Sequence, residues 1–257
     1  MKRKLSFLLA LLMVLQVCAY LLPGTAQAAT VGSGSCGPNA TWTYDSSKTL
    51  TITGTGAMAD YAPFDDSPWY TYRNSITALT IQEGVTTIGG DAIFQTAGLK
   101  SVTIPASVTK LGYGAFVDSG LEAVTFADES QLTTIDYYAF QNCEALTEIT
   151  LPAGVGSFWT DLVFYGCEAL TDIHVAEGNT TYKGIDGVLY TADKSMLVRY
   201  PAAKPETDYT IAPEKGIVVT CPTQDFTMFD FAEAKAIYQK GYDEGLAMID
   251  SIKQRIP

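Results

Sequence analysis

Cysteine and histidine are both scarce in this 257-residue chain, which has five cysteines and a single histidine, His174. Four cysteines lie after residue 28, and no two of them have the CxxC spacing of a zinc or redox motif. They are Cys36, Cys143, Cys167 and Cys221. They are too few for a disulfide scaffold, and a single histidine with scattered cysteines excludes a zinc site. We expect no metal and no cofactor.

Basic residues are also few, with 16 Lys and Arg against 28 Asp and Glu and a net charge of −12. Because nucleic-acid phosphates would repel so acidic a chain, we expect no nucleic-acid partner. An acidic surface is typical of a soluble protein that works outside the cell.

Long hydrophobic runs are limited to one, Leu5 to Leu22, and no run after Thr30 is long enough to span a bilayer. Lys2-Arg3-Lys4 precede the run and the small residues Ala26-Gln27-Ala28 follow it. This order predicts a secretory signal peptide over residues 1–28, whose removal brings the net charge to about −15. An uncleaved membrane anchor is the alternative. We expect an extracellular or cell-surface location, with no membrane span after cleavage.

What the sequence has in abundance is an internal repeat. Phe94, Phe116, Phe140 and Phe164 are spaced 22, 24 and 24 residues apart. An apolar triplet of the form Φ-x-x-Φ-x-Φ, with Φ apolar, recurs five times. The triplets are Ile76-Leu79-Ile81, Leu99-Val102-Ile104, Leu121-Val124-Phe126, Leu146-Ile149-Leu151 and Leu170-Ile173-Val175.

A unit of 22–25 residues is too short to bury its own apolar face, so stacked copies must share a core. The x-Φ-x-Φ alternation predicts one short strand per unit, closed at Pro105 and Pro152. We expect Val108 and Leu111 to add a second apolar pair, and Ala-Phe elements to fill the back of each coil. The fold class is therefore a β-rich solenoid with a short parallel sheet.

The segments LKSVTIPASVTKLGYGAF and LTEITLP resemble the BspA-type bacterial leucine-rich repeat over roughly residues 76–175. CGPNATWTYDSSKTLTITGTGAMADY is similar to the entry hairpin found ahead of such repeats, and GVLYTADKSMLVRYP to a hairpin found between them. The fourth repeat departs from the pattern at Trp159 and Asp161. The resemblance implies a secreted or surface-associated binding module, often an adhesin for host matrix proteins or neighbouring cells.

The two ends are expected to close the stack. Alternating residues at 42–44 and 50–53 predict a β-hairpin with a loop at 45–48, which caps the first coil together with Trp69. GIVVTC (216–221) predicts a strand, and Asp230 with Glu233 marks the start of a C-terminal α-helix. This tail is similar to the last strand and helix of patatin-like acyl hydrolases, but the serine and aspartate motifs of those enzymes are absent.

The expected domains are a signal peptide (1–28), an N-terminal hairpin cap (29–75), leucine-rich repeats with an inserted hairpin (76–215) and a C-terminal strand and helix (216–257). The strand pattern places one outward-facing position of five strands in a column about 20 Å long, because neighbouring strands lie about 4.8 Å apart. A second column runs beside it. The candidate partner-binding residues on these two columns are Thr80, Ser101, Thr103, Thr125, Glu148, Thr150, Asp172 and His174.

A hydroxyl-lined concave face could bind a protein or a glycan, although threonine also suits an exposed strand that binds nothing. His174 could act as a general base beside Asp172 and Thr150, but a lone histidine on a repeat face is usually a plain surface residue. Cys143 and Cys167 occupy one repeat position, where earlier repeats carry Gly98 and Gly120, and we favour buried free thiols over a disulfide.

The function predicted from the sequence is therefore a secreted or surface leucine-rich-repeat binding module, with a protein or glycan ligand that includes host extracellular matrix among its candidates. We expect no enzymatic activity. Two alternatives remain open: a structural spacer or fragment of a larger surface protein, and a lipid acyl hydrolase remnant.

Overall fold

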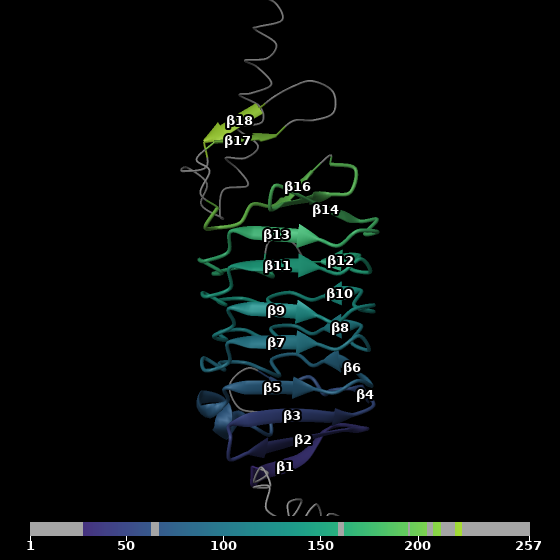
Figure 1. Cartoon of the computed structure of the whole chain (residues 1–257), viewed down its shortest axis with the longest axis vertical. Helices are drawn as coiled ribbons and strands as arrows, with labels where there is room; N and C mark the ends of the chain where they lie inside the picture. Colours follow the sequence, from purple (N-terminus) through teal and green to yellow (C-terminus); the bar gives the residue numbers. More distant parts are fainter. Residues whose placement is uncertain are drawn as a thin grey trace, which may run out of the picture.

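The computed structural model describes residues 28–62, 67–158, 162–194, 196–204, 208–211 and 219–222. These residues form a stack of coils in which parallel strands lie one above another along the long axis (Figure 1). The predicted signal peptide and C-terminal helix, and the departures at Trp159 and Asp161, lie outside the described residues. No helix among the described residues is both long enough and apolar enough to cross a membrane.

One side of the stack, here called the strand face, carries the five repeat strands that the apolar triplets predict. The second and third apolar residues of each triplet point inward, while the residues between them point outward. The strands are β5 (Ala78–Ile81), β7 (Ser101–Ile104), β9 (Ala123–Phe126), β11 (Glu148–Leu151) and β13 (Asp172–Val175). All five strand predictions are confirmed, because period-two alternation buries one face of an extended chain.

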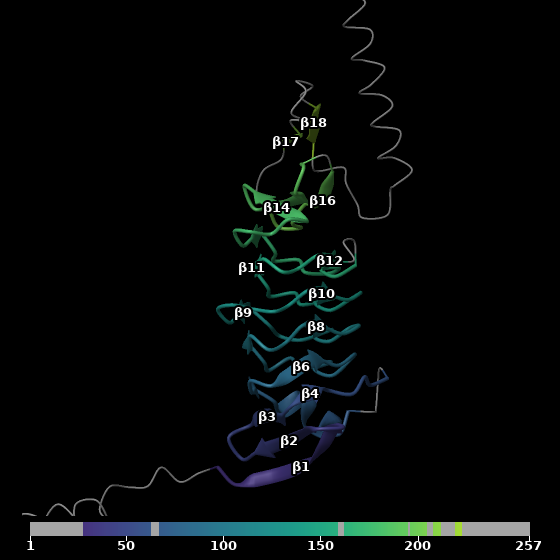
Figure 2. The same ribbon diagram turned by 90° about the vertical axis from the view of Figure 1, so that its right-hand side faces the viewer.

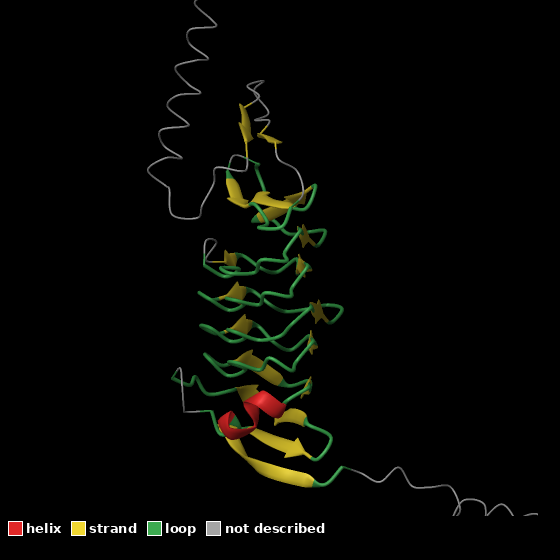
Figure 3. Cartoon of the chain, turned by 90° about the vertical axis from the view of Figure 1, so that its left-hand side faces the viewer, coloured by secondary structure: helices red, strands yellow, loops and turns green. Residues whose placement is uncertain are grey.

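Each coil then turns into a second strand of two to four residues, and these strands form a second parallel sheet (Figure 3). In sheet order they are β12 (Ser157–Phe158), β10 (Thr134–Ile135), β8 (Lys110–Leu111), β6 (Val85–Ile88) and β4 (Gly56–Ala57). Two sides of the coil therefore advance by the same strand spacing, and the stack has little curvature in Figure 2. The strand face is flat over these coils rather than concave as expected.

A third side of the stack is built from the turn segments that lead back to the next repeat strand, residues 90–96, 113–119, 137–143 and 162–167. Their buried phenylalanines stack, with ring centroids 5.5 Å apart for Phe116 and Phe140 and 5.8 Å apart for Phe140 and Phe164. The predicted Ala-Phe filling of the coil is confirmed, since these side chains are fully buried.

The first coil has a different register from the one expected. The amide of Ile93 donates to Ala115 O (2.8 Å), just as Phe116 donates to Ala139 O (2.8 Å). Ile93, and not Phe94, is thus the structural equivalent of Phe116, and the alignment on Phe94 was wrong by one residue. Periodicity alone could not show this, because either apolar residue satisfies the pattern.

The N-terminal region is a three-stranded antiparallel sheet of β1 (Thr30–Gly37), β2 (Ala40–Asp45) and β3 (Thr49–Gly54). The predicted hairpin is β2–β3, with a slightly shorter turn, but β1 was not foreseen. Strand β3 pairs in parallel with β5, so the cap continues the strand face. Trp69, next to the 3₁₀ helix η1 (Tyr70–Ser75), is buried and meets the Trp42 ring edge-on at 5.8 Å.

Past β13 the chain forms an antiparallel meander, and its existence agrees with the predicted inserted hairpin. Its strands are β14 (Tyr182–Ile185), β15 (Val188–Thr191) and β16 (Leu197–Arg199). Ile173 donates to Gly187 O (2.8 Å), which joins the meander to β13. A last antiparallel pair, β17 (Asp208–Ile211) and β18 (Val219–Pro222), overlaps the strand predicted at 216–221.

Candidate partner-binding face

The first predicted column is present as an exposed row of side chains on the strand face. Thr103 lies in register with Thr125, and Thr150 with His174, while Thr80 has the same outward position on β5. All five side chains are exposed. We call this set the hydroxyl row, because four of its five members are threonines.

The hydroxyl row extends onto the N-terminal sheet, which the sequence analysis missed. Thr51 is the register partner of Thr80, Thr43 of Thr51, and Ser33 of Thr43. The signal was available for Thr51, because Leu50-Thr51-Ile52 repeats the pattern of Leu79-Thr80-Ile81. Ser33 could not be found this way, since β1 has no apolar alternation. Outward hydroxyls thus occupy one position on seven strands before the row ends at His174.

The second column changes character along the stack. It begins with small side chains at Ala78, Ser101 and Ala123 and ends with the carboxylates of Glu148 and Asp172. Glu148 is exposed, and its Oε2 lies 4.0 Å from His174 Nε2. The strand face is therefore neutral and hydroxyl-rich over β5–β9 and acidic over β11–β13.

Asp172 is less available to a partner than the other predicted residues. It is half-buried, and its Oδ1 lies 3.4 Å from the Nζ of Lys204, whose side chain is only 7% exposed. A hydrogen bond from Thr171 and the charge of Lys204 hold the pKa of the Asp172 carboxyl below its usual value. This carboxylate is engaged in joining β13 to the chain that follows the meander.

The strand face is interrupted twice, and both interruptions coincide with a proline. In the hydrogen-bonded pairs, the residue after the second strand donates back to the first: Gln82 to Ile52 O (3.0 Å), and likewise Ala127 and Ala176. Pro105 and Pro152 hold this position after β7 and β11, and proline has no amide hydrogen to donate. The sheets accordingly separate between β5 and β7 and between β9 and β11.

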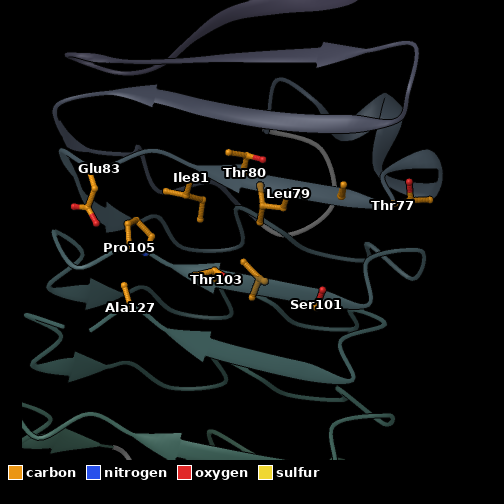
Figure 4. Close-up of a pocket in the computed structure, with 11 residues that line it drawn as sticks. Thr77, Leu79, Thr80, Ile81, Glu83, Ser101, Thr103, Pro105 and Ala127 are labelled. Carbon is orange, nitrogen blue, oxygen red and sulfur yellow. The ribbon is translucent and has the colours of Figure 1, made fainter. Parts of the chain in front are cut away.

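A shallow depression of about 470 Å³ lies on the strand face at the first interruption (Figure 4). Thr80, Ser101 and Thr103 contribute hydroxyls to it, and Pro105 forms part of its lining. Glu83 bridges the two coils, because its carboxylate accepts hydrogen bonds from the amides of Ala106 (2.7 Å) and Ser107 (3.1 Å). The bond from Ala106 is the main cause that lowers the pKa of Glu83.

The chemistry that this face offers is hydrogen bonding through exposed side chains. His174 has Glu148 as its ionic neighbour, with 4.0 Å between Nε2 and Oε2. Within the described part of the chain, no three His, Cys, Asp or Glu side chains gather as a metal site requires. Exposed hydroxyls with fixed spacing can instead donate to and accept from a ligand that lies along the row.

Cys143 and Cys167 are buried free thiols, as favoured. Their Sγ atoms donate to the carbonyls of Phe116 (3.3 Å) and Phe140 (3.1 Å) in the preceding coils. Burial raises the pKa of Cys143 to about 11 and raises that of Cys167 as well. The equivalent residues of earlier coils are Thr96 and Ser119, so the expectation of Gly98 and Gly120 was wrong. The amides of Leu99 and Leu146 fix this register, since they donate to Thr96 O and Cys143 O.

Comparisons with known proteins agree with this architecture. Residues 67–184 match the model of the BspA-type leucine-rich repeat region in six copies. The matched residues include all five repeat strands, from β5 to β13. No curated protein matches the sequence.

Several solved structures of bacterial leucine-rich repeat proteins are similar. One from Eubacterium ventriosum is 30% identical with a TM-score of 0.57, covering 70% of this chain and 53% of that one. The pneumococcal vaccine antigen PcpA is 21% identical with a TM-score of 0.49, covering 70% and 59%. A protein from Bacteroides capillosus is 25% identical with a TM-score of 0.33, covering 58% and 99%. The chain thus spans a little over half the length of the first two proteins.

Proposed function

We propose that this protein is a secreted or cell-surface leucine-rich-repeat solenoid that binds a protein partner through its strand face, as an adhesin does. The observation that carries the proposal is the hydroxyl row, which presents exposed, evenly spaced polar groups on consecutive strands. The match to the BspA-type repeats supports it, because repeat solenoids offer extended surfaces suited to macromolecular partners.

The neutral part of the face, over β5–β9, is the proposed centre of contact. It contains the depression lined by Thr80, Ser101 and Thr103, and its strand backbones are incompletely paired at Pro105. Binding there costs little desolvation free energy, because threonine and serine hydroxyls are desolvated at lower cost than carboxylates. The acidic end of the face, where Glu148 is exposed, would then select for a basic side chain at one end of the partner.

A structural spacer, within a longer surface protein, is the second candidate function. It is favoured by the partial coverage of the solved relatives, of which this chain spans 53% and 59%. A spacer needs a cohesive stack but no specific face. The two functions therefore differ in whether changes on the strand face, which leave the fold intact, have any effect.

The test is binding of the purified protein to an array of extracellular matrix proteins and glycans, beside a triple variant Thr103→Arg, Thr125→Arg, Thr150→Arg. A control, Tyr113→Arg with Ser157→Arg, places two arginines on exposed positions away from the strand face. We expect the wild type and the control to bind one protein and the triple variant to lose at least tenfold in affinity. Circular dichroism and thermal melting confirm that all three are folded.

Other outcomes decide between the alternatives. Loss in both variants would place the binding elsewhere, and binding to glycans alone would change the class of partner. No binding by any of the three would favour the spacer. An esterase assay on the same samples tests the acyl hydrolase alternative, for which we expect no turnover.

A further inference from the structure

Strand β1 ends the sheet β1-β2-β3-β5, and within the described ranges no strand pairs with its outer edge. It is eight residues long and lies at the end of the stack in Figure 1. Its outer edge presents a row of backbone amides and carbonyls, and such edges are templates for another strand.

This edge lacks most of the devices that usually prevent pairing. Thr30–Gly37 contains no charged residue and no proline, in a chain whose net charge is −12. Register irregularities occur between Thr30 and Gly32 and between Ser35 and Gly37. They leave Gly32–Ser35 as a regular stretch where pairing can run.

Little side-chain bulk projects from either face of β1, because most of its residues are glycine or serine. A Cβ placed on Gly32 would lie 2.9 Å from the Tyr72 hydroxyl, and one on Gly34 would lie 3.1 Å from Trp42 Nε1. The glycines therefore allow β1 to lie against the aromatic cluster of the cap. Ser33 and Ser35 point to the opposite side and are exposed. A strand with this pattern can lie beside an identical strand without steric conflict.

At the other end of the repeat strands, β13 is covered by the meander β14–β16. Gly187 O accepts the Ile173 amide (2.8 Å), and the Arg199 guanidinium donates to Phe164 O (3.2 Å), the carbonyl that a further coil would otherwise use. Pairing that uses only the β1 edge of each chain is isologous, so it joins two copies about a two-fold axis and is complete at the dimer.

We propose that two copies of this chain pair antiparallel through their β1 edges, centred on Gly32–Ser35. Antiparallel neighbours in one sheet are related by an axis perpendicular to that sheet, so both strand faces point the same way. The two hydroxyl rows then join through Ser33 into one face of twice the length. The pairing itself does not depend on the proposed function; only the use of the doubled face does.

The dimer should be weak, because one strand pair buries less area than a standard stable interface. Two chains of net charge −12 repel each other, and salt screens that repulsion. Association should therefore rise with both protein concentration and ionic strength, which distinguishes neutral edge pairing from assembly through charge attraction.

Sedimentation equilibrium of the purified protein, without any partner, tests the proposal. Its N-terminus is first defined by mass spectrometry. Val31→Lys with Ser33→Lys puts charge on the edge, and Thr125→Lys with Thr150→Lys makes the same change of charge on the middle of the face. We expect the wild type and the Thr variant to approach twice the monomer mass and the edge variant to remain monomeric. If the double edge variant unfolds, Ser33→Lys alone replaces it.

Small-angle X-ray scattering supplies the geometry, since end-to-end pairing nearly doubles the maximum dimension, whereas side-by-side packing does not. A wild type that stays monomeric at every concentration and salt level overturns the proposal, as does an edge variant that dimerises like the wild type. Failure of the proposed function would appear separately, as loss of partner binding in a protein whose mass still doubles.

Discussion

The strand face and the turn segments are two sides of the same coils, yet they are held together differently. On the strand face the hydrogen-bonded ladder stops at β5/β7 and again at β9/β11. Along the turn segments, one equivalent backbone amide in each coil donates a hydrogen bond to the next coil, and this series is unbroken. The bonds are Gln95 to Val117 O (2.9 Å), Asp118 to Gln141 O (2.9 Å) and Asn142 to Tyr165 O (2.7 Å). The stacked phenyl rings run beside these bonds.

This difference indicates that the coils are held together by the turn segments, the continuous second sheet and the core beneath them. The strand face can then carry prolines, a depression and exposed hydroxyls without loss of the fold. Residues of the strand face can therefore change to suit a partner with little effect on stability. Substitutions in the core and turn segments should destabilise the protein more than substitutions on the strand face.

Phe140→Ala should cause the largest loss. Phe140 is fully buried between Phe116 and Phe164, so the variant leaves a cavity in the middle of the stack and should lose about 3–5 kcal/mol of unfolding free energy. Urea denaturation measures this loss. Thr125→Ala, on the exposed side of the same region, is the control and should change stability by less than about 0.5 kcal/mol. Equal losses would contradict the comparison.

Asp91→Asn should make the protein more stable at neutral pH. Asp91 lies in the first turn segment and is buried, and burial raises the pKa of its carboxyl to about 6. The native state therefore holds this proton more tightly than the unfolded state, and stability falls as pH rises from about 4 to about 6.

Removal of the carboxyl should abolish that fall, with a gain of about 2–3 kcal/mol at pH 7 and almost none at pH 3. Asparagine also tolerates the positive φ of 49° at position 91. Thermal melting across this pH range is the measurement. A gain of the same size at pH 3 would show that the effect is not titration.

Asn142→Ala should cost about 1–2 kcal/mol. The variant loses the hydrogen bond from Asn142 Nδ2 to Asp118 Oδ1 (2.8 Å) and places alanine at φ 55°, where asparagine is better tolerated. Asn142→Gly removes the same bond but relieves the backbone. The difference between the two variants in chemical denaturation therefore separates the two causes. Identical losses would mean that the backbone conformation contributes nothing.

Pro105→Ala should have the smallest effect on stability, within about 1 kcal/mol of the wild type. It adds an amide that can donate to Ile81 O, as Ala127 does to Ile104 O. It also raises the conformational entropy of the unfolded chain, which opposes that gain. Hydrogen exchange is the informative measurement, because the new amide should be protected to the same degree as that of Ala127. An unprotected amide would show that the proline is not what interrupts the ladder.

Much of the strand face could be predicted from the sequence. The triplets identified all five repeat strands, and alternation placed Thr80, Thr103, Thr125 and Thr150 outward, because a strand has only two faces. The register of the first coil could not be predicted, because Ile93 and Phe94 are both apolar. The engagement of Asp172 by Lys204 was also invisible, since the two residues are 32 positions apart and come together only when the chain folds back past the meander.

The sequence by itself determined the class of fold, since units of 22–25 residues that cannot bury their own apolar faces have to stack. Only the tertiary structure decided how the strand face ends and where it breaks. Strand β1 has no apolar period and becomes a strand because its glycines fit over Trp42 and Tyr72. The breaks at Pro105 and Pro152 depend on which carbonyl a missing amide would have met, which is a property of neighbouring coils and not of either one alone.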